Sequence, residues 1–216
     1  MTSDGTYKFA PKRESIFVIL ALIPFFANDL LFLVSEGAPQ WLAIDYATKI
    51  VVLALLLGPS VMRAIALQAE PTQMRLYAIV LFAMLAFGLA LASDHYVRGW
   101  LDYLLPQTIL FSYPPIGDPA LYWFDMTFGL ALTAVSEELA FRKVLWHWLR
   151  PRLASTTTLY FLSAALFGLC HWSHGVGSVV SAFLIGLVLM GLYRRTGRIE
   201  VSMAVHYATL FILFYR

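Results

Sequence analysis

The chain has 216 residues, of which 60% are hydrophobic and 15% aromatic, and its mean hydropathy is +0.74. Only 13% of the residues are charged and the formal net charge is +2, whereas a soluble domain carries about 25% charged residues. The composition therefore excludes a water-soluble globular fold. The sequence has no stripe of basic residues of the kind that binds nucleic acid. The single cysteine, Cys170, rules out both a disulfide within these residues and a multi-cysteine metal site.

Seven apolar runs are predicted to cross a membrane, since a helix needs about 20 residues to span a hydrocarbon core of about 30 Å. Residues 1–14 are polar and are predicted to form a cytoplasmic arm, and residues 15–216 a single transmembrane domain. The sequence thus predicts an all-α, polytopic helix bundle. The predicted spans are 15–34, 42–57, 76–92, 121–149, 156–171, 179–193 and 199–214.

The segment from Trp100 to Phe111 is short and contains Pro106, so we expect an interfacial or re-entrant piece rather than a span. Charge supports this interpretation. With seven spans and the N-terminus inside, twelve Lys and Arg residues fall on the inner side and two on the outer side, as the positive-inside rule requires. We therefore expect an integral protein of a prokaryotic cytoplasmic membrane with a cytoplasmic N-terminus.

Ionisable residues inside the predicted spans are suspects for function, because each costs about 2.5–3.5 kcal/mol at a helix centre. Asp45 and Lys49 are four residues apart and are expected to pair. Asp125 is expected near the outer headgroups, where a charge costs little. Asn28 and Asp29 either line a polar cavity or bond another helix.

The fourth span contains the densest group of charges, in the stretch "EELAFR" from Glu137 to Arg142. Glu138 and Arg142 are four residues apart and are expected to form an ion pair along the helix. Glu137 points about 140° away from Arg142 at 100° per residue, so it is predicted to be a spare carboxyl. Such a group suits a general base.

His171 and His206 lie on two other apolar helices and are the candidates to meet Glu137. A Glu/His/His site for hydrolysis and a purely structural polar cluster both remain open on spacing alone. Cys170 is a poor nucleophile candidate because it is adjacent to His171 and lies about 100° away on the helix.

These residues resemble motifs of the CAAX protease and bacteriocin-processing family of intramembrane endopeptidases. "EELAFR" fits the family's EExxxR motif, and "FGLCH", from Phe167 to His171, fits its FxxxH motif. The stretch leading to His206 resembles the approach to a third motif, a histidine followed four residues later by Asn or Asp. The resemblance covers about residues 121–214 and places the catalytic core in 121–216.

The resemblance implies that Glu137 activates water, that His171 helps to hold it and that His206 stabilises the oxyanion. Glu138 and Arg142 would support the site. Two mechanisms stay open: one without metal, and one with zinc held by Glu137, His171 and His206.

The chain departs from the family pattern at Leu210, where Asn or Asp is expected. Thr209, Tyr207 or Asn28 could supply the missing donor, or His206 could act alone. His174 is expected either to cap its turn or to join the site.

The resulting hypothesis is an intramembrane endopeptidase that cuts a membrane-associated or lipidated protein in or beside the bilayer. The alternatives are a non-catalytic membrane immunity or assembly factor that keeps the protease fold, and a small transporter. Partners are the lipid bilayer and a membrane-protein or lipidated-peptide substrate. The sequence selects neither the substrate, its cleavage site nor an oligomeric state.

Overall fold

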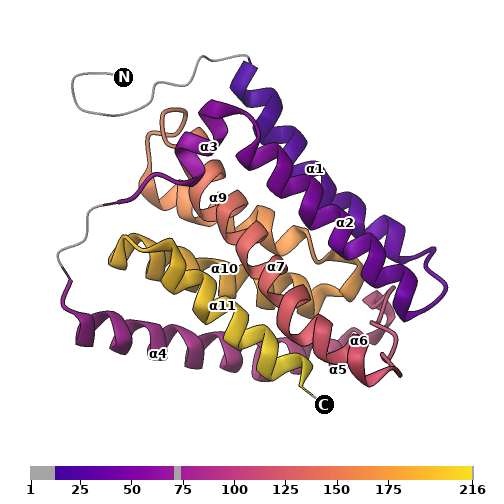
Figure 1. Cartoon of the computed structure of the whole chain (residues 1–216). Coiled ribbons are helices and arrows are strands. Elements are labelled where there is room, and N and C mark those ends of the chain that lie inside the picture. The colour runs from indigo at the N-terminus through magenta and orange to yellow at the C-terminus, as the bar shows by residue number, and fades with distance from the viewer. Residues whose placement is uncertain (1–12, 71–73, 216) are drawn as a thin grey trace, which may run out of the picture.

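The computed structural model describes residues 13–70 and 74–215, and every regular element in that part of the chain is a helix (Figure 1). The prediction of an all-α bundle is therefore confirmed. The predicted N-terminal arm falls almost entirely outside the described residues, and α1 begins at Arg13. The elements are α1 (Arg13–Phe32), α2 (Ala38–Leu57), α3 (Ser60–Ala66), α4 (Leu76–Ala92), η1 (Ser93–Arg98), α5 (Gly99–Leu104), η2 (Pro106–Thr108), α6 (Pro119–Phe124), η3 (Asp125–Gly129), α7 (Leu130–Glu137), η4 (Glu138–Val144), α8 (Leu145–Leu149), α9 (Thr156–Leu169), η5 (Trp172–His174), α10 (Val176–Thr196) and α11 (Ile199–Phe214).

Long helical runs coincide with each predicted span in the described part of the chain. Four of them are long and apolar enough to cross a membrane, namely Ser15–Phe32, Ala38–Leu57, Leu76–Leu104 and Val176–Thr196. The runs Thr156–Leu169 and Ile199–Phe214 are shorter and apolar. Residues 119–149 form one continuous helical run through α6, η3, α7, η4 and α8.

Local sequence signals explain where several helices begin and end. Asp118 caps α6, its side chain accepting from the Leu121 amide at 2.8 Å, and Pro119 occupies the first helical position. Ser155 caps α9 in the same way. Gly197 ends α10 in the left-handed conformation, with φ of 67°, which glycine adopts without strain.

The segment from Trp100 to Phe111 differs in part from its predicted interfacial or re-entrant form. Residues up to Leu104 continue the helical run that begins at Leu76, and the helix breaks at Leu105, before Pro106. The large rings of Trp100 and Tyr103 are exposed near this end, as expected of aromatic residues at a membrane interface. Only the stretch after Pro106 leaves the helix, because proline cannot continue the backbone hydrogen bonding.

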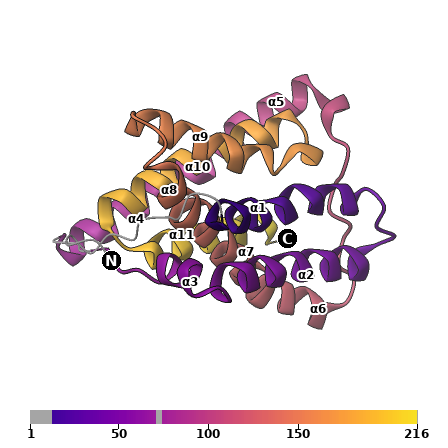
Figure 2. The ribbon, with the colours of Figure 1, turned by 90° about the horizontal axis from the view of Figure 1, so that it is seen from above.

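The helical run of residues 119–149, which contains α7, crosses the middle of the bundle and is surrounded by the other helices (Figures 1 and 2). α1 and α2 pack side by side, α10 packs along α9, and α4 contacts α10 and α11. The largest core cluster joins side chains of the N-terminal helices, such as Val18, Phe25 and Val52, to Phe141 and Val144 of η4. The charged stretch predicted to be functional therefore lies in the interior.

Gly168 of α9 lies close to the backbone of α10. A Cβ at this position would lie 2.7 Å from the Val179 carbonyl oxygen and 3.0 Å from Phe183 Cβ. We expect Gly168→Ala to lower the stability by about 1–3 kcal/mol, because the two backbones must separate. Gly191→Ala is the matched control, since no atom lies within 4 Å of its added Cβ. Thermal unfolding in detergent measures both, and equal melting temperatures for the two variants would contradict the prediction.

Candidate active site

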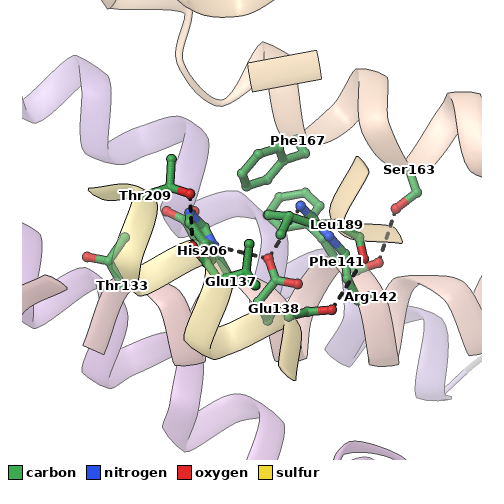
Figure 3. Close-up of polar contacts among 12 residues, drawn as sticks. Thr133, Glu137, Glu138, Phe141, Arg142, Ser163, Phe167, Leu189, His206 and Thr209 are labelled. Atoms are coloured by element: carbon green, nitrogen blue, oxygen red, sulfur yellow. Dashed lines mark hydrogen bonds and ion pairs between the residues drawn. The ribbon is translucent and has the colours of Figure 1, made fainter. Parts of the chain in front are cut away.

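The Glu138 carboxylate lies at the centre of the buried charges. Its Oε1 accepts a hydrogen bond from His206 Nδ1 at 3.0 Å and forms an ion pair with Arg142 Nη2 at 3.4 Å. Glu138 and Arg142 are fully buried, and His206 is 3% exposed. The predicted pairing of Glu138 with Arg142 is confirmed. Figure 3 shows the three side chains meeting from η4 and α11.

The imidazole of His206 lies between two carboxylates. Its other nitrogen, Nε2, is 3.7 Å from Glu137 Oε2, a separation at which a water molecule can bridge the two atoms. Glu137 is 7% exposed, and no hydrogen bond from another described residue reaches its carboxylate. Glu137 thus faces His206 and is free to act on a further group.

A change of helix type occurs exactly where the two glutamates lie: Glu137 ends α7, and Glu138 begins the π-helix η4. A π-helix bonds each amide to the carbonyl five residues earlier, and single-turn π segments are frequent at functional sites. Adjacent residues on a helix diverge by about 100°, so the two carboxylates reach the ring from different sides. The sequence predicts that Glu137 meets His206, whereas the contact of Glu138 with the same ring is not predicted from the spacing.

The Phe167 ring covers this charged group from α9. The Arg142 guanidinium lies 4.2 Å from its centroid, and the rings of His206 and His171 lie at 5.9 and 5.3 Å. Three nitrogens of Arg142 have no hydrogen-bond partner among the described residues, so the aromatic face is a substantial part of the arginine's environment. The phenylalanine of "FGLCH" therefore holds the charged groups in place.

His171 follows the end of α9 and lies in the turn that leads into η5. Its Nδ1 is 3.0 Å from the Phe167 carbonyl oxygen, so Nδ1 carries the proton in a neutral ring and Nε2 is an acceptor. Asp29 of α1 secures the turn, because its Oδ2 accepts from the Ser173 amide at 3.0 Å.

His174 lies in the same turn and is 7% exposed. Its Nδ1 is 3.2 Å from the Phe111 carbonyl oxygen, and its ring packs on Tyr113 with centroids 4.6 Å apart. Burial, reinforced by the neighbouring His171, lowers the pKa of His174 to about 3, so the ring is neutral at physiological pH. His174 therefore packs against aromatic rings and adds no charge to the site.

A cavity of about 340 Å³ opens beside this group of residues. Glu137, His171 and His206 all line it, so the structure brings the three predicted catalytic residues to one space. Its wall also contains Lys49 and Ser178, which sequence reasoning did not assign to the site. Apolar side chains complete the lining, including Trp41, Ile109, Phe111, Leu130, Ile185 and Phe214.

The candidate oxyanion donors other than His206 are engaged elsewhere. The Thr209 hydroxyl donates to the Val205 carbonyl at 2.8 Å, and the Tyr207 hydroxyl to the Met126 carbonyl at 3.2 Å. Asn28 Nδ2 donates to Asp45 Oδ1 at 3.2 Å. Leu210 lines the cavity of about 340 Å³, which we call the larger cavity. His206 is therefore the side chain best placed among these to donate to a group in the cavity.

Two expectations about the remaining charges have different outcomes. The pairing of Asp45 with Lys49 is confirmed, and Lys49 is 5% exposed. The placement of Asp125 near the outer headgroups stays a prediction; its side chain is buried and accepts from the Tyr46 hydroxyl at 2.8 Å. Tyr46 of α2 provides the partner that makes this burial tolerable.

The sequence leaves open a zinc site with Glu137, His171 and His206 as its ligands. In residues 13–70 and 74–215, no group of three or more His, Cys, Asp or Glu side chains is positioned to hold a metal ion. His206 and His171 each direct Nδ1 to a protein oxygen, which leaves one nitrogen per ring as a ligand. Zinc remains a prediction, and these residues as arranged do not fit it.

Comparison with known proteins gives one match. The family model described as "Type II CAAX prenyl endopeptidase Rce1-like" matches residues 119–212, which include all three motifs. Comparisons with curated proteins and with solved structures gave no match. The resemblance expected from the motifs is thereby confirmed.

Proposed function

We propose that the protein hydrolyses a peptide bond of a lipidated protein within or beside the bilayer, on the premise that residues 119–212 match the Rce1-like family model. The observation that carries the proposal is the His206 ring between two carboxylates at the edge of the larger cavity. One carboxylate is held by Arg142, and the other is available for proton transfer. The family's printed description, a CAAX prenyl endopeptidase, suggests a prenylated protein as substrate.

Glu137 would act as the general base. It takes a proton from water while the water oxygen attacks the carbonyl carbon of the scissile bond. His171 Nε2 can accept the second hydrogen of the same water and so orient it. When the C–N bond breaks, Glu137 returns its proton to the leaving amine nitrogen. One water is consumed, and a carboxylate and an amine are released.

His206 would stabilise the oxyanion that forms on the carbonyl oxygen. With a proton on each nitrogen, the ring donates through Nδ1 to Glu138 and through Nε2 towards the cavity. In that form the formal charges of the two glutamates, Arg142 and His206 sum to zero, as expected of buried charges that compensate one another. A donor aimed at developing charge is worth about 3 kcal/mol.

The direct test is cleavage of an internally quenched farnesylated peptide by the purified protein in proteoliposomes. We expect cleavage near the farnesylated cysteine, identified by mass spectrometry, and much slower cleavage of the same peptide without the lipid. Because the mechanism uses no metal, 1,10-phenanthroline is expected to leave the rate unchanged. Failure to cleave either peptide would count against the proposal, and inhibition reversed by added zinc would overturn its metal-free form.

Leu210 provides a test of the oxyanion role. It lies one turn after His206 and lines the larger cavity, so an amide at this position can add a second donor. We expect Leu210→Asn to raise kcat at least about tenfold, since one such donor changes kcat by roughly 10²–10³ in other hydrolases. Leu210→Met, which keeps an apolar side chain, is the control. Equal rates for both variants would argue against an oxyanion bound at this end of the cavity.

A further inference from the structure

A second, smaller cavity of about 30 Å³ lies behind the candidate site. Part of its polar lining comes from the N-terminal helices: Asn28 and Asp29 of α1, and Lys49 of α2. These three side chains are 4–5% exposed. Cys170, which is 8% exposed, contributes to the opposite part of the wall. None of these four residues has a role in the bond-breaking steps proposed above.

The two cavities share part of their walls. The residues that line both are Lys49, Tyr113, Glu137, His171 and His174. The carboxylate that would take the water's proton and the ring that would orient that water therefore stand between the two spaces.

The size and chemistry of the smaller cavity suit water. A water molecule occupies about 30 Å³ in the liquid, and a buried water makes about three hydrogen bonds. The Lys49 ammonium has three donors, and one of them contacts Asp45. Water in this cavity can accept from the ammonium and donate to the carboxylate of Glu137 and to Nε2 of His171.

Hydrolysis in this setting requires a separate source of water. The wall of the larger cavity combines apolar and polar side chains, and a lipidated substrate that fills it displaces the water there. Glu137 is only 7% exposed, so bulk water has little direct access to it. Each turnover nevertheless consumes one water molecule.

We propose that the smaller cavity is a water-holding chamber, built by Asn28, Asp29 and Lys49, that supplies the hydrolytic water to Glu137 and His171 while substrate occupies the larger cavity. The inference rests on the proposed endopeptidase function. It gives the first two helices a part in the reaction, whereas the family match covers only residues 119–212.

The test fills the chamber from Cys170, whose Sγ contacts the Leu166 carbonyl oxygen of its own helix at 3.2 Å. The series Cys170→Ala, →Val, →Leu and →Met increases side-chain volume while the residues in the proposed reaction stay unchanged. With the farnesylated peptide in proteoliposomes, we expect kcat to fall progressively, by tenfold or more at Met, while KM stays within twofold. Cys170→Ala is expected to retain kcat within threefold of the unaltered protein.

The results for this series of variants distinguish a water-holding chamber from the alternatives. Melting temperatures in detergent identify any variant that does not fold, and Cys170→Val keeps the series informative if the larger side chains unfold the protein. The chamber is refuted if kcat does not depend on the side-chain volume at position 170, or if Cys170→Ala is as slow as Cys170→Met. It is also refuted if KM rises while kcat is constant, because the cavity would then be a substrate subsite. If the unaltered protein cleaves nothing, the proposed function itself fails, and the chamber with it.

Discussion

Glu137→Gln is expected to abolish peptide cleavage, with a loss of roughly 10³-fold or more in kcat. Glutamine has the shape of glutamate but cannot take the proton from water. The melting temperature in detergent checks that the variant is folded. Glu200→Gln, an exposed position in the first turn of α11, is the matched control and should cleave normally.

The same pair of variants separates the competing functions in cells. A membrane-protein fragment that is lost only with Glu137→Gln, while its precursor accumulates, would identify the substrate. A non-catalytic immunity or assembly factor would retain its activity in both variants. A transporter would respond to an ion gradient in liposomes and release no cleavage product. Full cleavage by Glu137→Gln would remove the basis of the proposed mechanism.

Arg142→Met is expected to destabilise the protein by about 3–5 kcal/mol. The substitution keeps an apolar chain against Phe167 but leaves the fully buried Glu138 carboxylate without its cation, and breaking a buried pair costs about this much. Cleavage should fall as well, because Glu138 then holds His206 less firmly. Chemical unfolding in detergent measures the stability, and the peptide assay measures the activity.

The double variant Arg142→Met with Glu138→Gln distinguishes charge from packing. With both charges removed, much of the stability should return, since neutral replacements of a buried ion pair cost little. Activity should stay low, because an amide no longer offers His206 Nδ1 a charged acceptor. If the double variant is as unstable as Arg142→Met, the loss comes from packing around Phe167 rather than from the unpaired carboxylate.

The sequence predicted much of this arrangement because its signals are local. The four-residue spacing of Glu138 and Arg142, and of Asp45 and Lys49, was enough to predict both ion pairs. The apolar runs predicted the helices. Motif order pointed to Glu137, His171 and His206, and all three line one cavity.

Other features depend on tertiary context that spacing does not reveal. Both carboxylates lie against one ring where the π-helix begins at Glu138, and no propensity rule marks that change of helix type. Asp125 is buried because Tyr46, 79 residues earlier, offers it a hydroxyl. Lys49 looked satisfied by Asp45, and only the fold shows that it also reaches both cavities.

The mixed composition of the main core cluster bears on how this protein can be dissected. Val18, Phe25 and Val52 pack in one cluster with Phe141 and Val144, so side chains of the first two helices complete the core of the matched stretch 119–212. A fragment cut to the motif-bearing part would expose that interface and lose its shape. Chimeras with relatives must therefore exchange α1, α2 and the motif helices as one unit.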